Sequence, residues 1–248
     1  MTDKLTRKTA HSYDMEYMKE LHKPGCLTAH HGAFTKDNTC SYRWQAYTKA
    51  LTETRRPPLT GTLYVWPAEV AGPPEKGDWD IGRPGNFQEV ASTPFPHQGH
   101  HVVAYAELAN SIEDIGTSAS DPIAVRKRVR MGLVEEQYNL NDILNVVILP
   151  VGSMHADALG IPRHTKTAKH RSHNSYSKYI RDELNAIFMP MQKEVEDCNT
   201  VPVYRKSKKK IESLSKLAYG NILLAHPAGY QHLDDIPQHF LMKALKKK

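Results

Sequence analysis

The sequence has few cysteines and no long hydrophobic segment, and both absences exclude classes of protein. The three cysteines, Cys26, Cys40 and Cys198, form no Cys-x-x-Cys pair, so we expect reduced thiols rather than a disulfide framework. No stretch approaches the ~20 apolar residues that span a bilayer, and the polar N-terminus (1–17) lacks the apolar core of a signal peptide. The sequence therefore predicts a protein without a membrane partner, cytoplasmic in the cell that makes it.

Internal repeats and low-complexity tracts are absent too, so composition alone suggests divisions in the chain. Residues 1–55 are polar and look mostly helical, whereas prolines and glycines crowd residues 56–96 and exclude a long helix there. We predict three parts: an N-terminal segment with a Pro/Gly-rich linker (1–95), a compact core (96–190) and a basic, helical C-terminal extension (191–248).

The balance of charge is basic, with a formal net charge of +6 and a pI near 9.1. Basic residues concentrate in RKSKKK (205–210) and in the three lysines that end the sequence. They are either solvated tail residues or a patch that contacts phosphates and adds salt-dependent affinity for nucleic acid. Composition leaves both interpretations open.

Residues after 97 show clearer secondary-structure patterns. The β-branched and aromatic run at 100–105 predicts a short strand, and 146–149 predicts a second, buried one. Asp121 followed by proline predicts a helix start, with the helix ending at Gly132. Apolar residues at helical spacing predict a further helix over 173–188.

Histidine is unusually abundant, with 14 in the chain, and two are adjacent on the first predicted strand. Neighbouring side chains on a strand face opposite sides, so His100 and His101 cannot share one role. One can bind a metal while the other acts on water. A second pair, His30 and His31, directly follows an alanine, but no strand pattern follows it.

Two further elements bear candidate functional side chains. Asn145 directly precedes the second predicted strand, where its amide can form a turn, bridge a loop or orient an imidazole. His164, His170 and His173 follow within one basic segment, which either binds an ion or simply contacts phosphate. His155 is interpreted as a loop residue.

Together, the segments GHHVV, GLVEEQYNLNDILNVVILP, LGIPRH and SHNSYSKYI resemble the AHH family of toxin nucleases, in the His-Asn-His and endonuclease VII superfamily. The resemblance covers residues 99–184. It implies an α+β fold in which a ββα-metal (His-Me finger) core is embedded in a mostly helical domain.

The resemblance also implies roles for individual residues. His101 would be the general base and His100 a metal ligand, although the two could be exchanged. His164 and His173 would complete the site for one divalent ion, Zn, Ni, Mg or Mn. Asn145 would orient the base or brace the strand loop.

The chain departs from the family pattern before its last histidine. The family has three residues between its final two histidines, whereas eight separate His164 from His173 here, with His170 among them. His170 is therefore the substitute candidate for His164.

Nucleic-acid contacts are predicted for four basic residues: Arg163, Arg171, Lys127 and Arg130.

The function implied by the resemblance is a metal-dependent endonuclease that hydrolyses DNA with little sequence specificity, with RNA as the second candidate substrate. Such nucleases often act as antibacterial toxins, delivered by a secretion-system carrier into competing cells and neutralised at home by an immunity protein. Two alternatives remain: a metal-stapled nucleic-acid-binding module without turnover, and a housekeeping or phage DNA-processing nuclease.

Overall fold

A computed structural model describes residues 25–30, 36–53, 76–82, 86–87, 93–115, 117, 119–164, 173–196 and 204–243. In chain order the described elements are α2 (Tyr42–Glu53), the 3-10 turn η1 (Lys76–Asp78), β1 (His97–His101), α3 (Tyr105–Ile115), α4 (Pro122–Glu135), η2 (Ile143–Asn145), β2 (Val146–Pro150), α5 (Ser153–Leu159), α6 (Asn174–Glu196), α7 (Tyr204–Ala225), η3 (Leu233–Asp235) and α8 (Gln238–Leu241). Within the Pro/Gly-rich stretch, the sequence TLYVW at 62–66 favours a short extended piece, which lies outside these residues.

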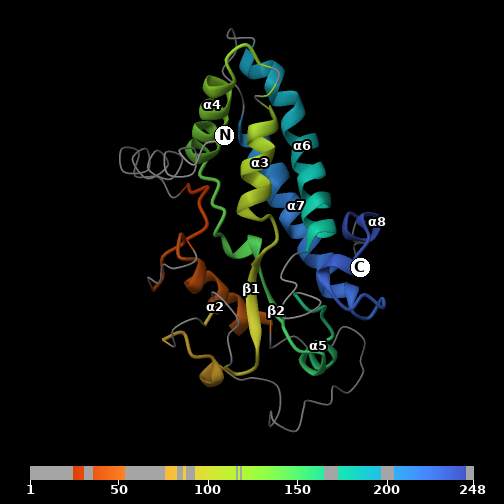
Figure 1. Cartoon of the computed structure of the whole chain (residues 1–248). Helices are drawn as coiled ribbons and strands as arrows, with labels where there is room; N and C mark the ends of the chain where they lie inside the picture. The colour runs from red at the N-terminus through yellow and green to blue at the C-terminus, as the bar shows by residue number, and fades with distance from the viewer. Residues whose placement is uncertain are drawn as a thin grey trace, which may run out of the picture.

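The fold places a two-stranded sheet beside a group of long helices. Figure 1 shows α3, α4, α6 and α7 at one end of the molecule, and β1 and β2 at the other with α2 and α5. β1 and β2 pair antiparallel, with His100 opposite Val147 and His101 opposite Val146. The predicted α+β fold, a small sheet within a mostly helical domain, is confirmed.

Strand β2 separates two hydrophobic cores, because alternate side chains face opposite sides. Val147 and Leu149 pack into the core among the long helices, whereas Val146 and Ile148 join a second core with Tyr42 of α2. Aromatic rings complete the second core: Trp79, Phe87 and Phe95. The two faces of the sheet therefore support different surroundings for residues on β1.

The first strand, predicted at 100–105, lies at 97–101, so it begins and ends earlier than its β-branched residues suggested. β1 ends at His101, Val102 and Val103 form a bend, and Tyr105 begins a helix that the sequence pattern did not indicate. The amide of Val102 still donates to the Asn145 carbonyl (2.8 Å) in register with the strands, but the Asn145 side chain then binds the amide (2.8 Å) and carbonyl (3.0 Å) of Val103, and the chain bends there. The prediction of a second strand is confirmed by β2.

The predicted end of the helix after Asp121 was wrong. The Asp121 side chain accepts from the Ala124 amide (3.0 Å), as expected of an N-cap, but α4 continues through Gly132 to Glu135. The buried end of α4 packs against Gly25, where an added Cβ would lie 2.3 Å from the Val134 carbonyl oxygen. Tertiary packing therefore extends the helix past its glycine.

His155 is also not in a loop, as interpreted from sequence, but on helix α5, where its ring stacks on Phe95 at 5.2 Å. The predicted helix over 173–188 is confirmed and extends further, since α6 continues through Pro190 to Glu196. Helix α7, from the predicted C-terminal extension, packs into the core among the long helices, the main core, which Val147 and Leu149 also join. Among the described helices, none is long and apolar enough to cross a membrane.

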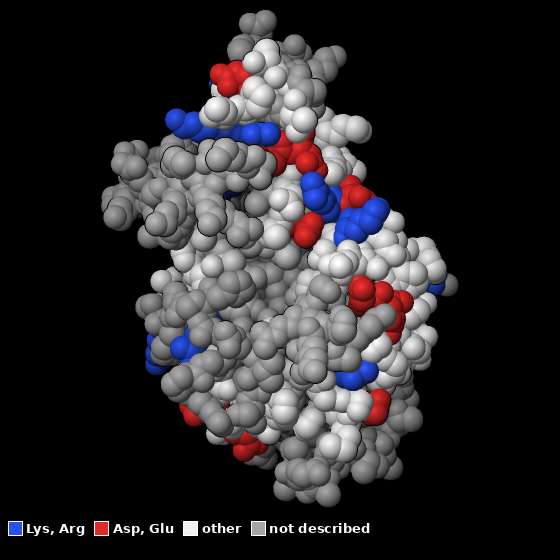
Figure 2. Space-filling model, in the orientation of Figure 1, with Lys and Arg blue, Asp and Glu red and all other residues white. Residues whose placement is uncertain are grey.

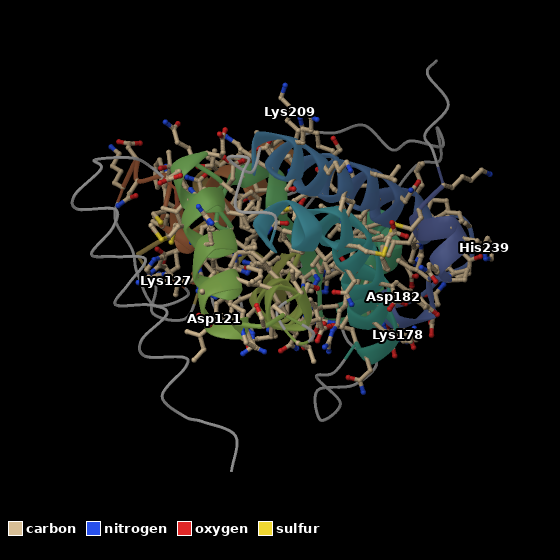
Figure 3. All side chains as sticks on the ribbon, turned by 90° about the horizontal axis from the view of Figure 1, so that it is seen from above. Asp121, Lys127, Lys178, Asp182, Lys209 and His239 are labelled. Carbon is tan, nitrogen blue, oxygen red and sulfur yellow. The ribbon has the colours of Figure 1, made fainter. Side chains whose placement is uncertain are left out.

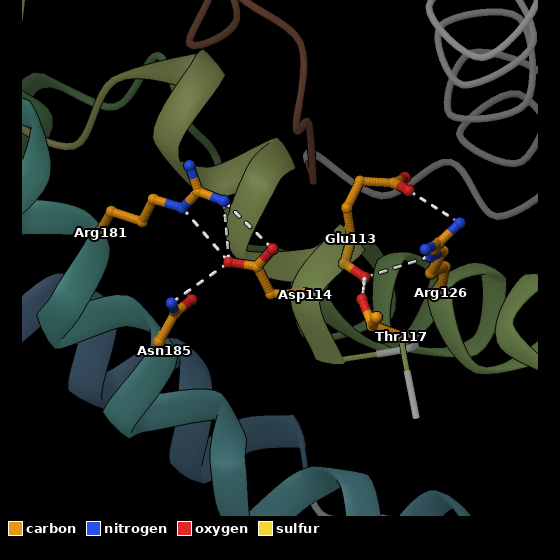
Figure 4. A network of polar contacts seen from close by, with 6 residues as sticks. All are labelled: Glu113, Asp114, Thr117, Arg126, Arg181 and Asn185. Atoms are coloured by element: carbon orange, nitrogen blue, oxygen red, sulfur yellow. Dashed lines mark hydrogen bonds and ion pairs between the residues drawn. The ribbon is translucent and has the colours of Figure 1, made fainter. Parts of the chain in front are cut away.

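Polar contacts join α3 to its neighbours on the exposed side (Figure 4). The Asp114 carboxylate accepts from Arg181 (2.9 Å) and Asn185 (3.2 Å) of α6. Glu113 pairs with Arg126 of α4 at 2.8 Å. These contacts, together with the apolar core, fix α6 relative to the helix that directly follows β1.

Candidate metal centre

Three of the predicted site histidines converge on one point. His100 lies on β1, His164 follows α5, and His173 directly precedes α6. Each offers a ligand nitrogen, and these nitrogens all lie within 4.8 Å of one another. His164 Nε2 is 3.0 Å from His100 Nδ1, and the His173 ring lies 4.7 Å from that of His100. Three imidazoles placed in this way could together hold one metal ion.

The electrostatics of the cluster favour neutral imidazoles. Burial lowers the pKa of His100 well below its usual range, and the neighbouring histidines lower it further. Burial, with a contribution from His173, lowers the pKa of His164 to about 3, and burial also lowers that of His173. Neutral imidazoles keep the lone pairs that bind metal ions.

The nitrogens that face each other, His100 Nδ1 and His164 Nε2, are placed to share one ion. The opposite nitrogens, His100 Nε2 and His164 Nδ1, are buried without a hydrogen-bond partner among the described residues. Three nitrogen donors suit Zn, Ni or Mn better than Mg or Ca, which prefer oxygen ligands.

The start of α6 holds His173 in place. Its Nδ1 contacts Ser177 Oγ at 3.0 Å. This contact orients the ring and leaves Nε2 as the nitrogen that can bind an ion. Asp234, on η3, accepts from the backbone amides of Ser175 (2.6 Å) and Tyr176 (3.1 Å) and so caps the helix from a distant segment. The Tyr176 hydroxyl donates to the carbonyl of the residue after His101 (2.7 Å) and ties α6 to β1.

His164 is held by backbone contacts on both sides. Its amide donates to Pro150 at the end of β2 (3.1 Å). The preceding residue, Arg163, forms a bridge with His232, and its guanidinium lies 2.9 Å from the His232 ring. The segment 231–235 therefore positions both His164 and the start of α6.

Asn145 contacts backbone rather than an imidazole. Its Oδ1 accepts from the Val103 amide (2.8 Å), and its Nδ2 donates to the carbonyls of Val103 (3.0 Å) and Leu140 (2.8 Å). The Ser215 hydroxyl on α7 donates to the same Oδ1 at 2.9 Å. Of the two roles predicted for Asn145, the geometry matches bracing of the loop after β1.

The residue that contacts His101 is Asn141. Its Oδ1 lies 3.1 Å from His101 Nε2, while its Nδ2 donates to the Thr28 carbonyl (2.8 Å) and its Oδ1 accepts from the His30 amide (3.4 Å). A carbonyl can only accept and a backbone amide can only donate, so these partners fix which end of the side chain is oxygen. His101 Nε2 must then carry the hydrogen, and the lone pair is on Nδ1.

His101 lies on the face of β1 opposite the three-histidine cluster, where its neighbours are Asn141 and Tyr42. His101 is only 5% exposed, and its ring lies 4.4 Å from the ring of Tyr42 on α2. The expected separation of two adjacent histidines by strand alternation is what the structure shows. Sequence analysis missed Asn141 and Asp234; the turn sequence YNLND contains Asn141, but nothing there indicates a contact with a histidine 40 residues earlier.

The other predicted site residues lie away from the cluster or outside the described part. His170 and Arg171 fall in 165–172, outside the described residues. Lys127 is exposed on α4, as Figure 3 shows, and Arg130 is half-buried on the same helix. Of the alternative pair, His30 contacts Cys26 and Asn141, and His31 lies outside the described residues.

A two-stranded antiparallel sheet and a helix that bring histidines to one point define the ββα-metal class of nuclease folds. The sequence profile of the AHH family, a nuclease family of the HNH/ENDO VII superfamily with conserved AHH, matches residues 81–200. Residues 81–200 therefore match a nuclease family of the HNH/ENDO VII superfamily, which agrees with the resemblance predicted over 99–184. No curated protein and no solved structure matches the chain.

Proposed function

We propose that this protein is a metal-dependent endonuclease that hydrolyses phosphodiester bonds of DNA with little sequence specificity. The observation that supports this most is the convergence of His100, His164 and His173 beside His101, within the segment that matches a nuclease family. His100, with His164 and His173 beside it, would form a metal-binding group, and His101 on the other side of β1 would provide a separate base; metal-assisted hydrolysis uses both.

The proposed ligands of one divalent cation are His100, His164 and His173, with His170 as a substitute for His164. When bound, the cation would neutralise charge that develops on the phosphate during hydrolysis. The ligand nitrogens favour Zn, Ni or Mn, and Mg is a further candidate through the superfamily. Burial keeps all three described imidazoles neutral and ready to bind.

His101 is the proposed general base. The hydrogen bond between Nε2 and Asn141 Oδ1 selects the tautomer in which Nδ1 can take a proton from water. As the proton is transferred, the positive charge that forms on His101 is stabilised by the Asn141 carbonyl oxygen. Asn145 supports this arrangement indirectly, because it holds the bend that immediately follows His101.

Contacts with the nucleic-acid backbone are proposed for Arg163, Arg171, Lys127 and Arg130. Such contacts add affinity without reading sequence, since phosphates are the same at every base pair. On the face in Figure 2, the Lys and Arg side chains of described residues are interspersed with Asp and Glu. Because acidic residues separate the basic ones on that face, we expect contacts through individual Lys and Arg side chains rather than through one large basic patch. The net charge of +6 favours such contacts with a polyanion.

The biological role proposed from the family resemblance is that of an antibacterial toxin. The protein would be made in the cytoplasm, delivered by a secretion-system carrier into competing cells, and held inactive at home by an immunity protein. Induced expression of the wild type should then stop growth and degrade chromosomal DNA, while His101→Ala should not. Harmless expression of an enzyme that is active in vitro would instead favour a housekeeping or phage DNA-processing nuclease.

The test of the enzymatic proposal is nicking of supercoiled plasmid by purified protein, with a chelator or with added Zn, Ni, Mn or Mg. His101→Ala should reduce the rate by about 10²–10⁴-fold, and His173→Ala should remove the dependence on metal together with activity. His239→Ala is the control, because that side chain is exposed on α8 (Figure 3). Metal and DNA binding without nicking of DNA or RNA would favour the non-catalytic binding module.

A further inference from the structure

A second cluster of metal-ligating side chains lies outside the three-histidine centre. Cys26, His30 and Cys40 bring their ligand atoms within 4.8 Å of one another. Cys26 Sγ is 3.1 Å from His30 Nε2. Cys26 is buried, His30 and Cys40 are half-buried, and both cysteines are thiols. Neither the family profile, which matches 81–200, nor the proposed reaction assigns them a role.

The backbone fixes Cys26 in this cluster. Its amide donates to the Tyr138 carbonyl (2.8 Å), and its carbonyl accepts from the Leu140 amide (2.7 Å). The residue before it must be glycine, because a Cβ on Gly25 would lie 2.3 Å from the Val134 carbonyl oxygen. Cys26 is thus held against the segment 138–140 by its own main chain.

Cys40 is brought to the same place by an independent set of contacts. Asn38 Oδ1 accepts from the Cys40 amide (2.8 Å), which shapes the turn before α2. Asn139 Nδ2 donates to the Thr39 carbonyl (2.7 Å). Both cysteines are therefore placed by the segment around Asn139, so the cluster does not depend on contacts among its own side chains.

We propose that Cys26, His30 and Cys40 bind a zinc ion, separate from the metal of the three-histidine centre. Two sulfurs and one imidazole are ligands that zinc prefers, and three protein ligands leave one position of a tetrahedral site for a further ligand. On binding, each thiol ionises and its proton passes to solvent.

The second site is connected to His101 through Asn141. Thr28 and His30 lie in the segment 26–30, which carries two of the proposed ligands. The Thr28 carbonyl accepts from Asn141 Nδ2, and the His30 amide donates to Asn141 Oδ1. Asn141 Nδ2 also lies 3.9 Å from Cys40 Sγ. An ion at this cluster would fix the segment 26–30, and thereby fix the amide that selects the tautomer of His101. Cys26, His30 and Cys40 are in this respect positioning residues, and only this consequence rests on the proposed function.

The first test replaces zinc with cobalt(II), whose thiolate complexes have a charge-transfer band in the near ultraviolet. The band should appear in the wild type and in His173→Ala, and be lost in Cys40→Ser. Cys198→Ser is the matched control, since it removes the third cysteine and should keep the band. Zinc measured by mass spectrometry should fall by one equivalent per chain in Cys40→Ser relative to Cys198→Ser.

A thiolate–cobalt band in His173→Ala would support the second site even if no variant cleaves DNA, so the two proposals fail separately. Absence of the band in folded wild type would overturn the zinc site, as would its persistence in Cys40→Ser. A disulfide between Cys26 and Cys40 in peptides from freshly purified wild type would also overturn it.

If Cys40→Ser does not fold, wild-type protein still decides the question. Zinc should protect Cys26 and Cys40 from alkylation in the intact chain, and a chelator should expose both, while Cys198 should react at the same rate in both conditions. Equal protection with and without chelator would contradict the proposal.

The positioning role has its own readout. Cys40→Ser that folds should lower kcat about 10–100-fold with little change in KM, because ligand-supporting contacts have effects of that size. It should also alter the acidic limb of the pH–rate profile, since Asn141 would no longer select one tautomer of His101. A loss of stability alone would lower the amount of active enzyme but leave the shape of that profile unchanged.

Discussion

Single hydrogen bonds decide what each histidine of β1 can do. His101 is fixed by the Asn141 carbonyl oxygen, whereas His100 and His164 contact one another and retain unpartnered buried nitrogens. Residues of the same type, adjacent in sequence, thus acquire different hydrogen-bond partners from their different surroundings. That difference is what separates a base from a ligand.

Replacement of Asn141 tests this assignment. Asn141→Ala should reduce plasmid nicking about 10–100-fold, the range found for contacts that orient a functional histidine. Asn141→Asp should instead raise the pKa of His101, because a carboxylate favours the imidazolium, and shift the acidic limb of the pH–rate profile to higher pH. Asn185→Ala is the control, because Asn185 contacts Asp114 on the exposed side of α6. An unchanged profile in Asn141→Asp would argue against His101 as the base.

His97, also on β1, illustrates burial without a ligand role. It lies among Trp79, Phe87 and Phe95, and burial lowers its pKa from 6.5 to about 4. In the unfolded chain it binds a proton below pH 6.5, but in the folded chain only near pH 4. The free energy of unfolding of the metal-free protein should therefore fall as pH drops from 6.5 to 4, with His97 contributing on the order of 3 kcal/mol.

Chemical denaturation of the metal-free protein at several pH values measures this contribution. His97→Phe should reduce the pH dependence between 6.5 and 4, while the exposed His239→Gln should not. An identical slope in His97→Phe and wild type would show that His97 titrates normally in the folded protein.

The residues that sequence could and could not identify differ in the range of their contacts. His100, His164 and His173 were predicted as a group because local motifs surround each one, and the structure places them together. Asn141 and Asp234 act through partners 40 and 59 residues away. Contacts at that separation leave no local pattern, so sequence could not have revealed them.

At the scale of elements, helix α6 follows the proposed ligand His173, and its first turn is capped by Asp234 of η3. Asp234→Ala would remove the acceptor for two amides at the start of α6, so we expect a loss of about 1 kcal/mol of stability and weaker metal binding through His173. Asp182→Ala is the matched control on the same helix: its exposed pair with Lys178 (2.7 Å, Figure 3) should contribute about 0.3–0.5 kcal/mol. Thermal unfolding and metal titration measure the two effects, and equal metal affinity in both variants would count against the cap.

Element boundaries were harder to predict than the elements themselves. β2 and α6 were correctly predicted because periodicity and apolar runs are local properties. Gly132 failed as a helix end because packing of α4 against Gly25 outweighs the small cost of a glycine in a helix. β1 ended early because Asn145, 42 residues on, captures the backbone of the bend.

At the scale of the whole molecule, the positive net charge should make DNA binding depend on salt. Each phosphate contact that is lost should reduce the slope of log affinity against log salt by about 0.9. Lys127→Gln should show this reduction if Lys127 contacts the backbone, while Lys127→Arg retains the charge and the slope. Binding titrations at several salt concentrations provide the measurement, and equal slopes for both variants would remove α4 from the binding surface.

The core also predicts which fragment can fold. Ile211, Ala218 and Ile222 of α7 are fully buried in the main core, and Tyr42 of α2 is fully buried in the second. The segment 81–200 alone would expose both cores to water. We expect it to lack cooperative unfolding in circular dichroism, whereas 25–243 should unfold cooperatively. A folded 81–200 fragment would show that these contacts are dispensable.

The contacts of Thr28 and Asp234 with the site have a consequence for how such a nuclease can be exchanged between genes. The segment 81–200 that matches the family carries the three-histidine ligands, yet Thr28, which holds Asn141, and Asp234, which caps the helix after His173, come from its two flanks. Recombination with breakpoints at the edges of 81–200 would transfer the three histidines without the residues Thr28 and Asp234 that help to position the site. Inheritance as a working cassette therefore requires breakpoints outside 25–243, so the flanks should travel with the motif even where their sequences drift.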